Sequence, residues 1–478
     1  MRGLLVILIF VAQISLSQKQ GNIWYFGDGA GLDFNTGSPV ALSDGQTYLL
    51  PGFYHNEGCS TVCDSSGALL LYCNGEVIWN RNHEILPGGH ILGSCSSTQA
   101  SLIVPAPESD SLFYVFSVDG FFQHNLMFGL RYSIVDMCLD DGLGDVIAGK
   151  RNILLVDTVA EKISAVRHSN GIDYWIITHE YFSDAFYAFL LTSDGFTSTV
   201  VSNIGSVHID VWDTTHTGCA IGQMKVSPDG SKLALCFSNT NPSVTELFDF
   251  NTTSGVVSNF ISLPTNSEDL GAYGVEFSPD NTKLYFANND YSYICQYDLS
   301  AGEGNADSIR SSKTTVSYNY SGGNKVFGMQ LGPDNKIYVA IFDKPFLDVI
   351  QNPNEEGVAC NYIDYGVDLD GNYCSMSIPG FISGYDYSNG IAKCATGFME
   401  MKSQEDINVY PNPTNGIIKI KTDKEILYFK IFNLFGQLMF EAGFQNEIDI
   451  SELNSGLYIL KLYDNTNLMI KTIKIVKE

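Results

Sequence analysis

The stretch AIGQMKVSPDGSKLALCFS, which begins at Ala220, decides the fold because two later stretches align with it. These are AYGVEFSPDNTKLYFANND from Ala272 and VFGMQLGPDNKIYVAIFD from Val326. Each contains a strand-like run, a Pro-Asp turn and a second strand-like run. The proline fixes φ, and the residues after it tolerate a tight turn. The repeat therefore predicts a series of similar β-hairpins.

Weaker copies of this hairpin precede the three clear ones. They are CSTVCDSSGALLLYC from Cys59, STQASLIVPAPESDSLFYVF from Ser97 and KISAVRHSNGIDYWIITHE from Lys162. Several hairpins are followed by an outward strand and a second turn, as in FDFNTTSG from Phe248. A four-stranded unit of about 50 residues, repeated radially, is typical of a β-propeller.

A closed propeller requires the two ends of its chain to meet. SMSIPGFISGYDY from Ser375 supplies an inner hairpin with little chain left for outer strands, and GLDFNTGSPVAL from Gly31 matches the outer-strand pattern. Joining them predicts a seventh blade built from both ends. We therefore expect an all-β protein, with a seven-bladed β-propeller body followed by a small antiparallel β-sandwich. The alternative for the body is a sandwich or two smaller sheets.

Composition agrees with an exported all-β protein. The 478 residues include 12% aromatic and only 17% charged side chains, and Tyr, Phe, Val and Thr favour strands. Fifty-three acidic residues against 26 basic ones give a net charge of −27. So negative a surface repels phosphate backbones, which makes nucleic acid a poor partner. Solubility outside the cell is the simpler explanation of the charge.

The N-terminus has the pattern of a secretory signal peptide. Arg2 precedes a short apolar run, and small residues at Ser15 and Ser17 suit a signal peptidase. We expect cleavage before Gln18. The run is too short to span a membrane as a helix. The predicted organisation is a signal peptide over 1–17, a propeller over 18–394, a linker over 395–405 and a further domain over 406–478.

Eleven cysteines in an exported chain permit disulfides, and their odd number leaves at least one unpaired within the chain. Buried thiols are expected where cysteines lie inside apolar strand-like runs, at Cys73, Cys236 and Cys295. Turn-rich segments surround two candidate bridges, Cys59 with Cys63 and Cys360 with Cys374. No C-x-x-C knuckle is present, so a structural role for the cysteines is favoured over zinc binding.

The C-terminal 73 residues change in pattern to short alternating strands divided by Asn-Gly, Phe-Gly and Ser-Gly turns. The distinctive residues of this segment include Pro411, Asn412, Pro413, Gly416, Gly436, Gly456 and Tyr458. Through them the segment resembles the type A sorting domain of the type IX secretion system. The resemblance implies recognition by the type IX translocon, delivery to the medium or the outer cell surface, and attachment to surface lipopolysaccharide in some cases.

The body contains three further recognisable stretches, NIWYFGDGAGLDFNTGSPV, SSTQASLIVPAP and GLRYSIVDMCLDDGLGDV. Through them it resembles uncharacterised propeller regions that often precede such sorting domains. It implies an architecture and no activity. The SPDG hairpins are similar to those of lactonase-type propellers as well, although such hairpins are short and widespread.

Aligned hairpins place one polar residue at the same position of successive first strands: Arg167, Lys225, Glu276 and Gln330. If these strands are innermost, the four side chains line a central channel, with His168 beside Arg167. Such a set fits the mouth of a ligand site or, alternatively, a polar network satisfied between blades. The sequence leaves both interpretations open.

Two weaker candidates concern metals. His208 and His216 share a segment with Asp210, Trp212 and Asp213, and imidazole can serve as a metal ligand or a base. No nucleophile motif of the G-x-S-x-G or H-E-x-x-H type accompanies them. The acidic run Asp364, Asp368, Asp370 and Asn372 has oxygen ligands at alternate positions, as calcium prefers, but it lacks the terminal Glu of a full calcium loop and is better explained as a solvated turn.

These observations favour an exported propeller that binds a glycan, a peptide or a partner protein, with no cofactor and no catalytic residue assigned. The candidate ligand-binding residues are Arg167, His168, Lys225, Glu276 and Gln330. The main alternative is an extracellular hydrolase or lactonase of the propeller type, and a passive structural layer protein is a third possibility.

Overall fold

The computed structural model describes residues 19–47, 56–121, 126–208, 218–237, 244–264, 271–318, 324–384, 407–422, 426–433, 437–463 and 469–478. The chain forms two compact units, Met1–Cys394 and Ala395–Glu478. We call them the body and the C-terminal unit, and each is described by itself. The segment predicted to be a signal peptide lies outside the described residues.

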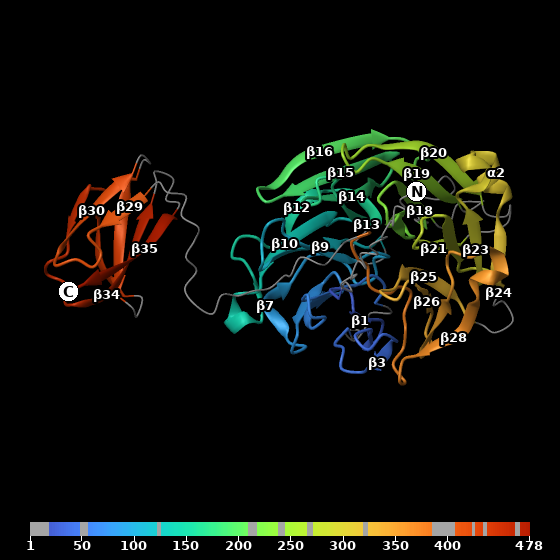
Figure 1. Ribbon diagram of the computed structural model, residues 1–478, viewed down its shortest axis with the longest axis horizontal. Coiled ribbons are helices and arrows are strands. Elements are labelled where there is room, and N and C mark those ends of the chain that lie inside the picture. Colours follow the sequence, from blue (N-terminus) through green and yellow to red (C-terminus); the bar gives the residue numbers. More distant parts are fainter. Residues whose placement is uncertain are drawn as a thin grey trace, which may run out of the picture. The chain divides into compact units, whose positions relative to one another are not determined.

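The body is built from antiparallel sheets, most of which have four strands in chain order (Figure 1). The first three sheets contain the following strands: β1 (Ile23–Phe26), β2 (Ala30–Asp33) and β3 (Val40–Leu42); β4 (Ser60–Cys63), β5 (Leu69–Cys73), β6 (Val77–Asn80) and β7 (Ile85–His90); β8 (Ser101–Pro105), β9 (Leu112–Val118), β10 (Leu130–Asp136), β11 (Asp145–Val146) and β12 (Ile153–Val156).

Four further sheets complete the described part of the body. They contain the following strands: β13 (Val159–Arg167), β14 (Tyr174–Glu180), β15 (Ala185–Thr192) and β16 (Gly195–Asn203); β17 (Met224–Val226), β18 (Lys232–Phe237), β19 (Val244–Phe250) and β20 (Val257–Pro264); β21 (Ala272–Phe277), β22 (Lys283–Asn288), β23 (Tyr293–Asp298) and β24 (Thr314–Tyr318); β25 (Val326–Leu331), β26 (Ile337–Ile341), β27 (Phe346–Ile350) and β28 (Tyr362–Asp368).

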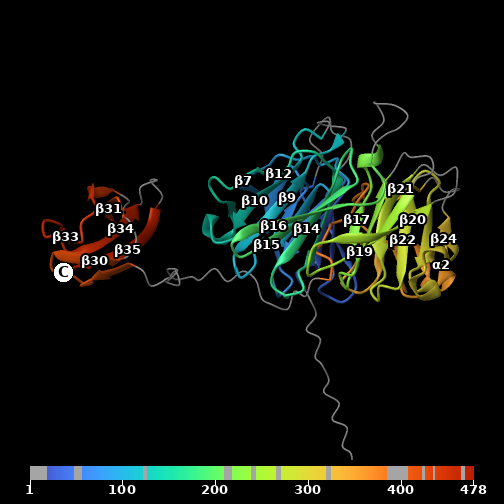
Figure 2. The same cartoon turned by 90° about the horizontal axis from the view of Figure 1, so that it is seen from above.

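The sheets are arranged radially, which is a propeller-like architecture. Each of the first strands β1, β4, β8, β13, β17, β21 and β25 contacts the next one in this order. The fourth strands β16, β20, β24 and β28 lie at the periphery (Figure 1). The helix α2 (Ala306–Ser311) lies at this rim beside β24 (Figure 2) and contacts β20 and β23. The prediction of an all-β body is confirmed.

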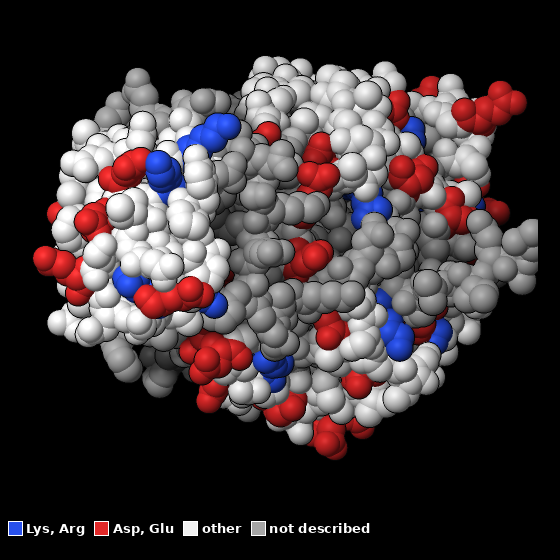
Figure 3. Space-filling model, turned by 60° about the vertical axis from the view of Figure 1, so that its left-hand side comes forward, with Lys and Arg blue, Asp and Glu red and all other residues white. Residues whose placement is uncertain are grey.

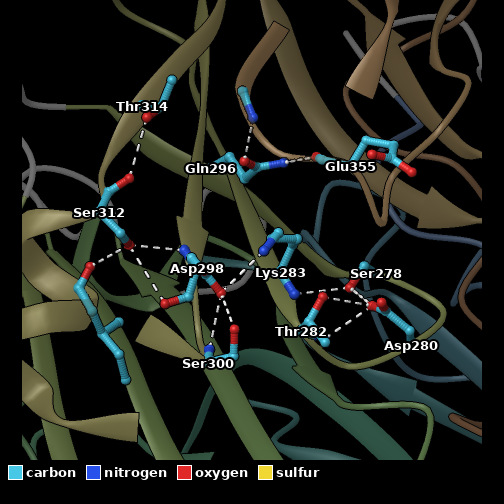
Figure 4. Close-up of polar contacts among 12 residues, drawn as sticks. Ser278, Asp280, Thr282, Lys283, Gln296, Asp298, Ser300, Ser312, Thr314 and Glu355 are labelled. Atoms are coloured by element: carbon cyan, nitrogen blue, oxygen red, sulfur yellow. Dashed lines mark hydrogen bonds and ion pairs between the residues drawn. The ribbon is translucent and has the colours of Figure 1, made fainter. Parts of the chain in front are cut away.

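The repeated Ser-Pro-Asp turn explains why these hairpins form (Figure 4). The Asp280 carboxylate accepts hydrogen bonds from the Ser278 hydroxyl at 2.7 Å and the Thr282 hydroxyl at 2.9 Å. Lys283 then forms an ion pair with Asp298 on β23 at 3.0 Å. Residues of the same type repeat the arrangement in the preceding sheet, at Ser227, Asp229, Ser231, Lys232 and Asp249. The turn thus fixes both the hairpin and its third strand.

The aligned hairpins are confirmed as the first two strands of their sheets, but the predicted composition of the closing blade is wrong. The N-terminal segment makes its own hairpin from β1 and β2 and adds β3. Residues 375–384 contain no strand hairpin. The physical reason is that these residues form isolated β-bridges with β4 and β13 and one backbone hydrogen bond with β25. Contacts with three different sheets leave them no partner strand of their own.

Apolar side chains fill the spaces between neighbouring sheets. Trp24 of β1 is fully buried and meets the Tyr338 ring of β26 edge-on, with ring centroids 5.4 Å apart. The first sheet in the chain therefore packs against the last. Between the fourth and fifth sheets, Phe186 and Phe248 pack in the same way at 4.9 Å.

Most of the cysteines that the structure describes are buried, and neither predicted disulfide forms. Cys73, Cys236 and Cys295 are fully buried, as expected for thiols inside strands. Cys59, Cys63, Cys360 and Cys374 are free thiols, so both candidate bridges are wrong. Cys360 and Cys374 belong to different apolar clusters, which explains why a turn-rich sequence between them does not bring them together.

The C-terminal unit consists of two antiparallel sheets that enclose a common apolar cluster, which includes Ile418, Ile431 and Leu460. Their strands are β29 (Ile407–Tyr410), β30 (Ile417–Thr422) and β33 (Glu447–Asp449) in one sheet, and β31 (Tyr428–Asn433), β32 (Leu438–Gly443), β34 (Gly456–Tyr463) and β35 (Met469–Lys477) in the other.

Helix is nearly absent from the described chain. Besides α2 there are short 3-10 turns at Asp140–Gly142, Gly218–Ala220, Ala301–Gly304 and Gly357–Cys360. None of the described helices has the length and apolar character needed to cross a membrane.

Candidate functional site

Three of the five predicted site residues meet where the first strands converge. Lys225 on β17 forms an ion pair with Glu276 on β21, with Nζ 3.2 Å from Oε2. Lys225 also donates a hydrogen bond to the side-chain oxygen of Gln330 on β25. The remaining acceptor capacity of Glu276 is used by the backbone N–H groups of Phe277 and Leu331, both at 3.0 Å. All three side chains are buried, and each comes from a different sheet. Together they form a polar network that joins three neighbouring sheets.

Arg167 and His168 lie at the end of β13. Arg167 is half-buried opposite Tyr174 of β14. The His168 Nε2 atom lies 3.1 Å from the backbone oxygen of Thr253, in the loop between β19 and β20. The Nδ1 atom accepts a hydrogen bond from the backbone N–H of Asn170 at 3.0 Å. His168 therefore links its own turn to the neighbouring sheet.

Residues 373–384, which we call the crossing segment, run through the region where the first strands converge. The segment pairs singly with several sheets in turn. Gly328 N–H of β25 donates to the Met376 carbonyl at 2.9 Å, and Gly380 N–H donates to the Cys59 carbonyl at 2.9 Å. Ser383 N–H donates to the Ala165 carbonyl of β13 at 2.8 Å. The centre of the body is thus occupied by the body's own chain.

Glycines make room for this segment. A Cβ at Gly328 would lie 2.6 Å from the Ser377 hydroxyl, and one at Gly384 would lie 1.8 Å from the Pro228 carbonyl oxygen. Gly384 also has a positive φ of 57°, which favours glycine. What remains beside the segment, near Lys225 and Gln223, is a small cavity with room for about one water molecule.

Sequence reasoning missed a second buried polar cluster, at the start of the first strands. Glu57 accepts hydrogen bonds from the Tyr273 hydroxyl at 2.7 Å and the Ser96 hydroxyl at 2.9 Å. Glu161 accepts two from Thr98, from its backbone N–H and its hydroxyl, each at 2.9 Å. The signal was present: Glu161 stands inside the apolar strand pattern VAEKISAV, where a charged side chain needs a partner.

Burial controls the protonation of this second cluster. Desolvation, with a smaller contribution from the charge of Glu161, raises the pKa of Glu57 to about 8. Desolvation also raises the pKa of Glu161 and lowers that of Lys162 to about 8. The Lys162 ammonium donates to the carbonyls of Ala220 and Gly222, both at 2.9 Å. The cluster joins several sheets and has the contacts of a structural network.

The structure describes the two candidate metal sites, the His208–His216 segment and the acidic run 364–372, to different extents. His208 is described and fully buried, whereas His216, Asp210, Trp212 and Asp213 lie outside the described residues. In the acidic run, Asp368 accepts the backbone N–H of Asp370 at 2.9 Å, as in a turn. Across the described ranges, no group of three or more His, Cys, Asp or Glu side chains has the geometry to hold a metal ion.

Of the residues that carry the resemblance to a sorting domain, Pro411, Asn412 and Pro413 lie on an exposed turn that contacts the last strand. The Asn412 side chain donates to the Lys474 carbonyl at 2.5 Å and accepts from Val476 N–H at 2.8 Å. Its neighbours Pro411 and Pro413 are exposed on the same turn, whereas Tyr458 is buried and donates to the Asn454 carbonyl at 2.8 Å.

Two glycines of the sorting pattern are described as well. At Gly416, an added Cβ atom would lie 2.3 Å from the Ser451 hydroxyl oxygen, so the position has no room for a side chain. Gly456 is exposed at the start of β34. Gly436 lies outside the described residues. The exposed proline turn is held in place by the hydrogen bonds between Asn412 and the last strand.

A family model confirms the interpretation of this unit. Residues 408–478 match the secretion system C-terminal sorting domain. The C-terminal unit is a type IX sorting domain. It implies interaction with the type IX secretion machinery, and therefore export to the outer surface or the medium. None of the curated proteins matches the chain.

Solved structures that match most of the chain at low similarity include two propeller-like proteins. One is PorZ, an essential bacterial surface component of the type IX secretion system of Porphyromonas gingivalis. It is 14% identical, covers 94% of this chain and has a TM-score of 0.35, and this chain covers 62% of it. The other is the periplasmic gluconolactonase PpgL of Pseudomonas aeruginosa, at 12% identity, with 85% of this chain and 94% of that one covered and a TM-score of 0.37. At these values the likeness assigns no activity to the body.

Proposed function

We propose that the chain is a type IX-exported binding protein whose body contacts its ligand with the outside of its sheets. The observation that carries this proposal is the occupied centre: the crossing segment runs through it, and Lys225 is paired there with Glu276 and Gln330. A ligand would have to displace the chain's own backbone to reach these side chains. The contacts therefore favour a polar network over a ligand mouth.

The proposal includes the finer organisation of the chain. The seven sheets are blades of one closed ring, with the first sheet completing it against the last through Trp24 and Tyr338. The C-terminal unit is a small sandwich, and the boundaries fall after residues 17, 394 and 405. Residues 1–17 act as a signal peptide that takes the chain across the inner membrane, and the sorting domain then directs it outward, for release or for attachment to surface lipopolysaccharide.

The outer strands β16 and β20, which we call the uncharged rim, are the surface best suited to a ligand. Neither strand has a charged residue, although the chain has 53 acidic side chains. On the face shown in Figure 3, acidic side chains are dispersed among wide uncharged areas. Val201 and Phe260 are exposed on the rim, and the Val257 N–H donates to the Ser202 hydroxyl at 3.0 Å, which joins the two strands. Edge strands that do not bind usually carry charges.

This rim favours a protein or peptide partner over a free glycan, because a β-strand edge offers backbone hydrogen bonds to an extended chain. The test measures binding of the labelled full-length protein to a peptide array and to a glycan array. Val201→Glu with Phe260→Glu should abolish binding, whereas Ile85→Glu, at a similarly exposed site on β7, should not. Equal binding by all three proteins would remove the rim from the proposal.

The alternative is a hydrolase or lactonase acting at the convergence of the first strands. It is tested by incubating the full-length protein with a sugar lactone and following ring opening. Our proposal expects no turnover above the uncatalysed rate. Turnover that is lost in Gln330→Ala would place catalysis at the centre and replace the binding proposal.

A further inference from the structure

Two histidines that no part of the proposed function uses are stacked inside the body. The rings of His179, at the end of β14, and His208, after β16, lie with centroids 3.8 Å apart and planes at 18°. Both side chains are fully buried. Two aromatic rings also contact the stack: Phe186 meets His179 edge-on at 4.6 Å, and Phe237 lies 4.5 Å from His208.

This stack joins two segments of the body. The backbone N–H of Phe182 donates to the His208 carbonyl at 3.1 Å, and the His208 N–H donates to the Ser183 carbonyl at 3.0 Å. The turn between β14 and β15 is thereby held to the segment 204–208. Phe182 itself is 61% exposed and has a φ of 67°, a conformation that a bulky residue rarely adopts without such restraints.

The charged groups around the stack make it sensitive to acid. Glu246 on β19 places Oε2 3.7 Å from His208 Nε2, and its Oε1 accepts the Ser206 N–H at 3.1 Å. Lys162 on β13 and, from the turn, Asp184 also act on the histidines, and Glu180 follows His179 directly. Among the described residues, Glu246 is the anion nearest to His208.

Acidification removes that anion. Burial raises the pKa of Glu246 to about 7, so its carboxyl group becomes neutral as the pH falls below neutrality. Burial also lowers the pKa of both histidines well below the usual value, and the charge of Lys162 opposes their protonation further. A proton taken up by either ring would then create a buried cation beside Lys162 with little compensation.

We propose that the His179–His208 stack is an acid-sensitive latch, which holds the turn 181–184 to the segment 204–208 and releases it below about pH 6. Both rings are neutral in the closed state, whereas released rings take up protons near pH 6.5. The contribution of the two histidines is therefore complete above about pH 6.5 and decreases as the pH falls. Glu246 acts in the opposite direction, because burial raises its pKa in the closed state, so the proton that it takes up there offsets the effect of one histidine. This inference does not depend on the proposed binding function.

The test follows amide hydrogen exchange of Phe182 and His208 in the full-length protein from pH 7.5 to 5.0, corrected for intrinsic rates. The opening constant should rise by up to about tenfold per pH unit below 6.5 when both histidines protonate on release, because the proton held by Glu246 in the closed state offsets one of the two. His208→Phe keeps an aromatic ring and both backbone hydrogen bonds, so it should flatten the pH dependence. His90→Phe, at an exposed site on β7, is the control and should behave as the wild type.

Equal pH dependence in the wild type and His208→Phe would overturn the latch. If His208→Phe does not fold, ring chemical shifts of the wild type decide instead. Both rings should remain neutral until protection of Phe182 is lost. Protonation of either ring near pH 6.5 with protection unchanged would show that the stack is no latch.

Discussion

The C-terminal unit and the body display their sequence motifs in opposite ways. In the C-terminal unit, the recognisable residues Pro411, Asn412 and Pro413 are exposed on a turn, fixed from below by the last strand. In the body, the residues that repeat alignment singles out, such as Lys225 and Glu276, are buried and paired. The motif residues are therefore accessible to solvent in this turn of the C-terminal unit and internal in the body.

The difference has a physical origin. A sorting signal must be read by another protein, so its distinctive side chains have to reach solvent. A repeated fold recreates the same environment in each sheet, so residues at aligned positions occupy equivalent sites on successive first strands. They do so whether or not a ligand binds near them. Burial, and not recurrence, separates the two cases.

The largest effect is expected from removing residues 395–478. Loss of the sorting domain should abolish appearance at the cell surface or in the medium, while the body still reaches the periplasm and melts at an unchanged temperature. Fractionation of a secretion-competent host, with calorimetry of the purified proteins, measures both. Surface appearance of the truncated chain would contradict the sorting role, and an unfolded periplasmic chain would contradict the independence of the units.

A milder version of this experiment targets the exposed turn. Asn412→Ala removes two hydrogen bonds to the last strand and should reduce export, whereas Asn415→Ala, exposed on the same connection, should not. If both variants are exported like the wild type, the fixed turn is not what the machinery reads.

Deleting residues 21–40 should have the next largest effect, now on the body alone. The deletion removes β1 and β2 with the fully buried Trp24 and Phe26. Cutting each such side chain to alanine alone costs about 3–5 kcal/mol, which for two is comparable with the roughly 5–15 kcal/mol that stabilises a typical domain. We expect the whole body to lose its cooperative transition in calorimetry. A retained transition with only local loss of exchange protection would show that the ring does not depend on its first sheet.

The fold of the body was predictable because its decisive signals are local. The Pro-Asp turn and the Ser, Thr and Lys residues around it encode a hairpin within about 20 residues, and the structure forms those hairpins at Met224, Ala272 and Val326. Closure was not predictable in the same way. Residues 375–384 have the sequence pattern of another hairpin. In the structure they instead make isolated backbone contacts with several sheets, and the positions of these sheets are set by distant parts of the chain.

The candidate site was predicted in part, for the same reason. Alignment placed Lys225, Glu276 and Gln330 together, but no local pattern could tell that the crossing segment fills the space beside them. Glu57, which precedes β4, and Glu161, on β13, were missed because their hydrogen-bond partners lie far away in the chain. The disulfide predictions failed because spacing alone does not fix which apolar cluster receives a cysteine.

Breaking the central network should cost less than losing a sheet. Lys225→Met leaves Glu276 buried without its cation and should destabilise the body by about 3–5 kcal/mol in urea unfolding. Lys225→Met combined with Glu276→Gln should cost clearly less than the sum of the two single changes, because the pair acts as a unit. As the control, Asp307→Ala breaks an exposed ion pair with Arg310 and should leave the midpoint unchanged. Additive effects would mean that Lys225 and Glu276 do not interact.

The smallest effect is expected at His168, the one predicted site residue whose described contacts run to a neighbouring loop. Its Nε2 contact with the Thr253 carbonyl lies near the surface, where a hydrogen bond contributes about 1 kcal/mol or less. The backbone N–H of Ser169 also donates to the Thr252 carbonyl at 3.1 Å, so the two loops stay joined when the ring is removed. His168→Ala should therefore lower the urea midpoint slightly, raise amide hydrogen exchange only in the turn 168–173 and leave ligand binding unchanged.

The control is His168→Gln, which keeps a hydrogen-bond donor and should recover part of the lost stability. A binding defect in His168→Ala at unchanged stability would return this residue to the ligand site and would make the body resemble the sorting domain, with its motif residues on the functional surface.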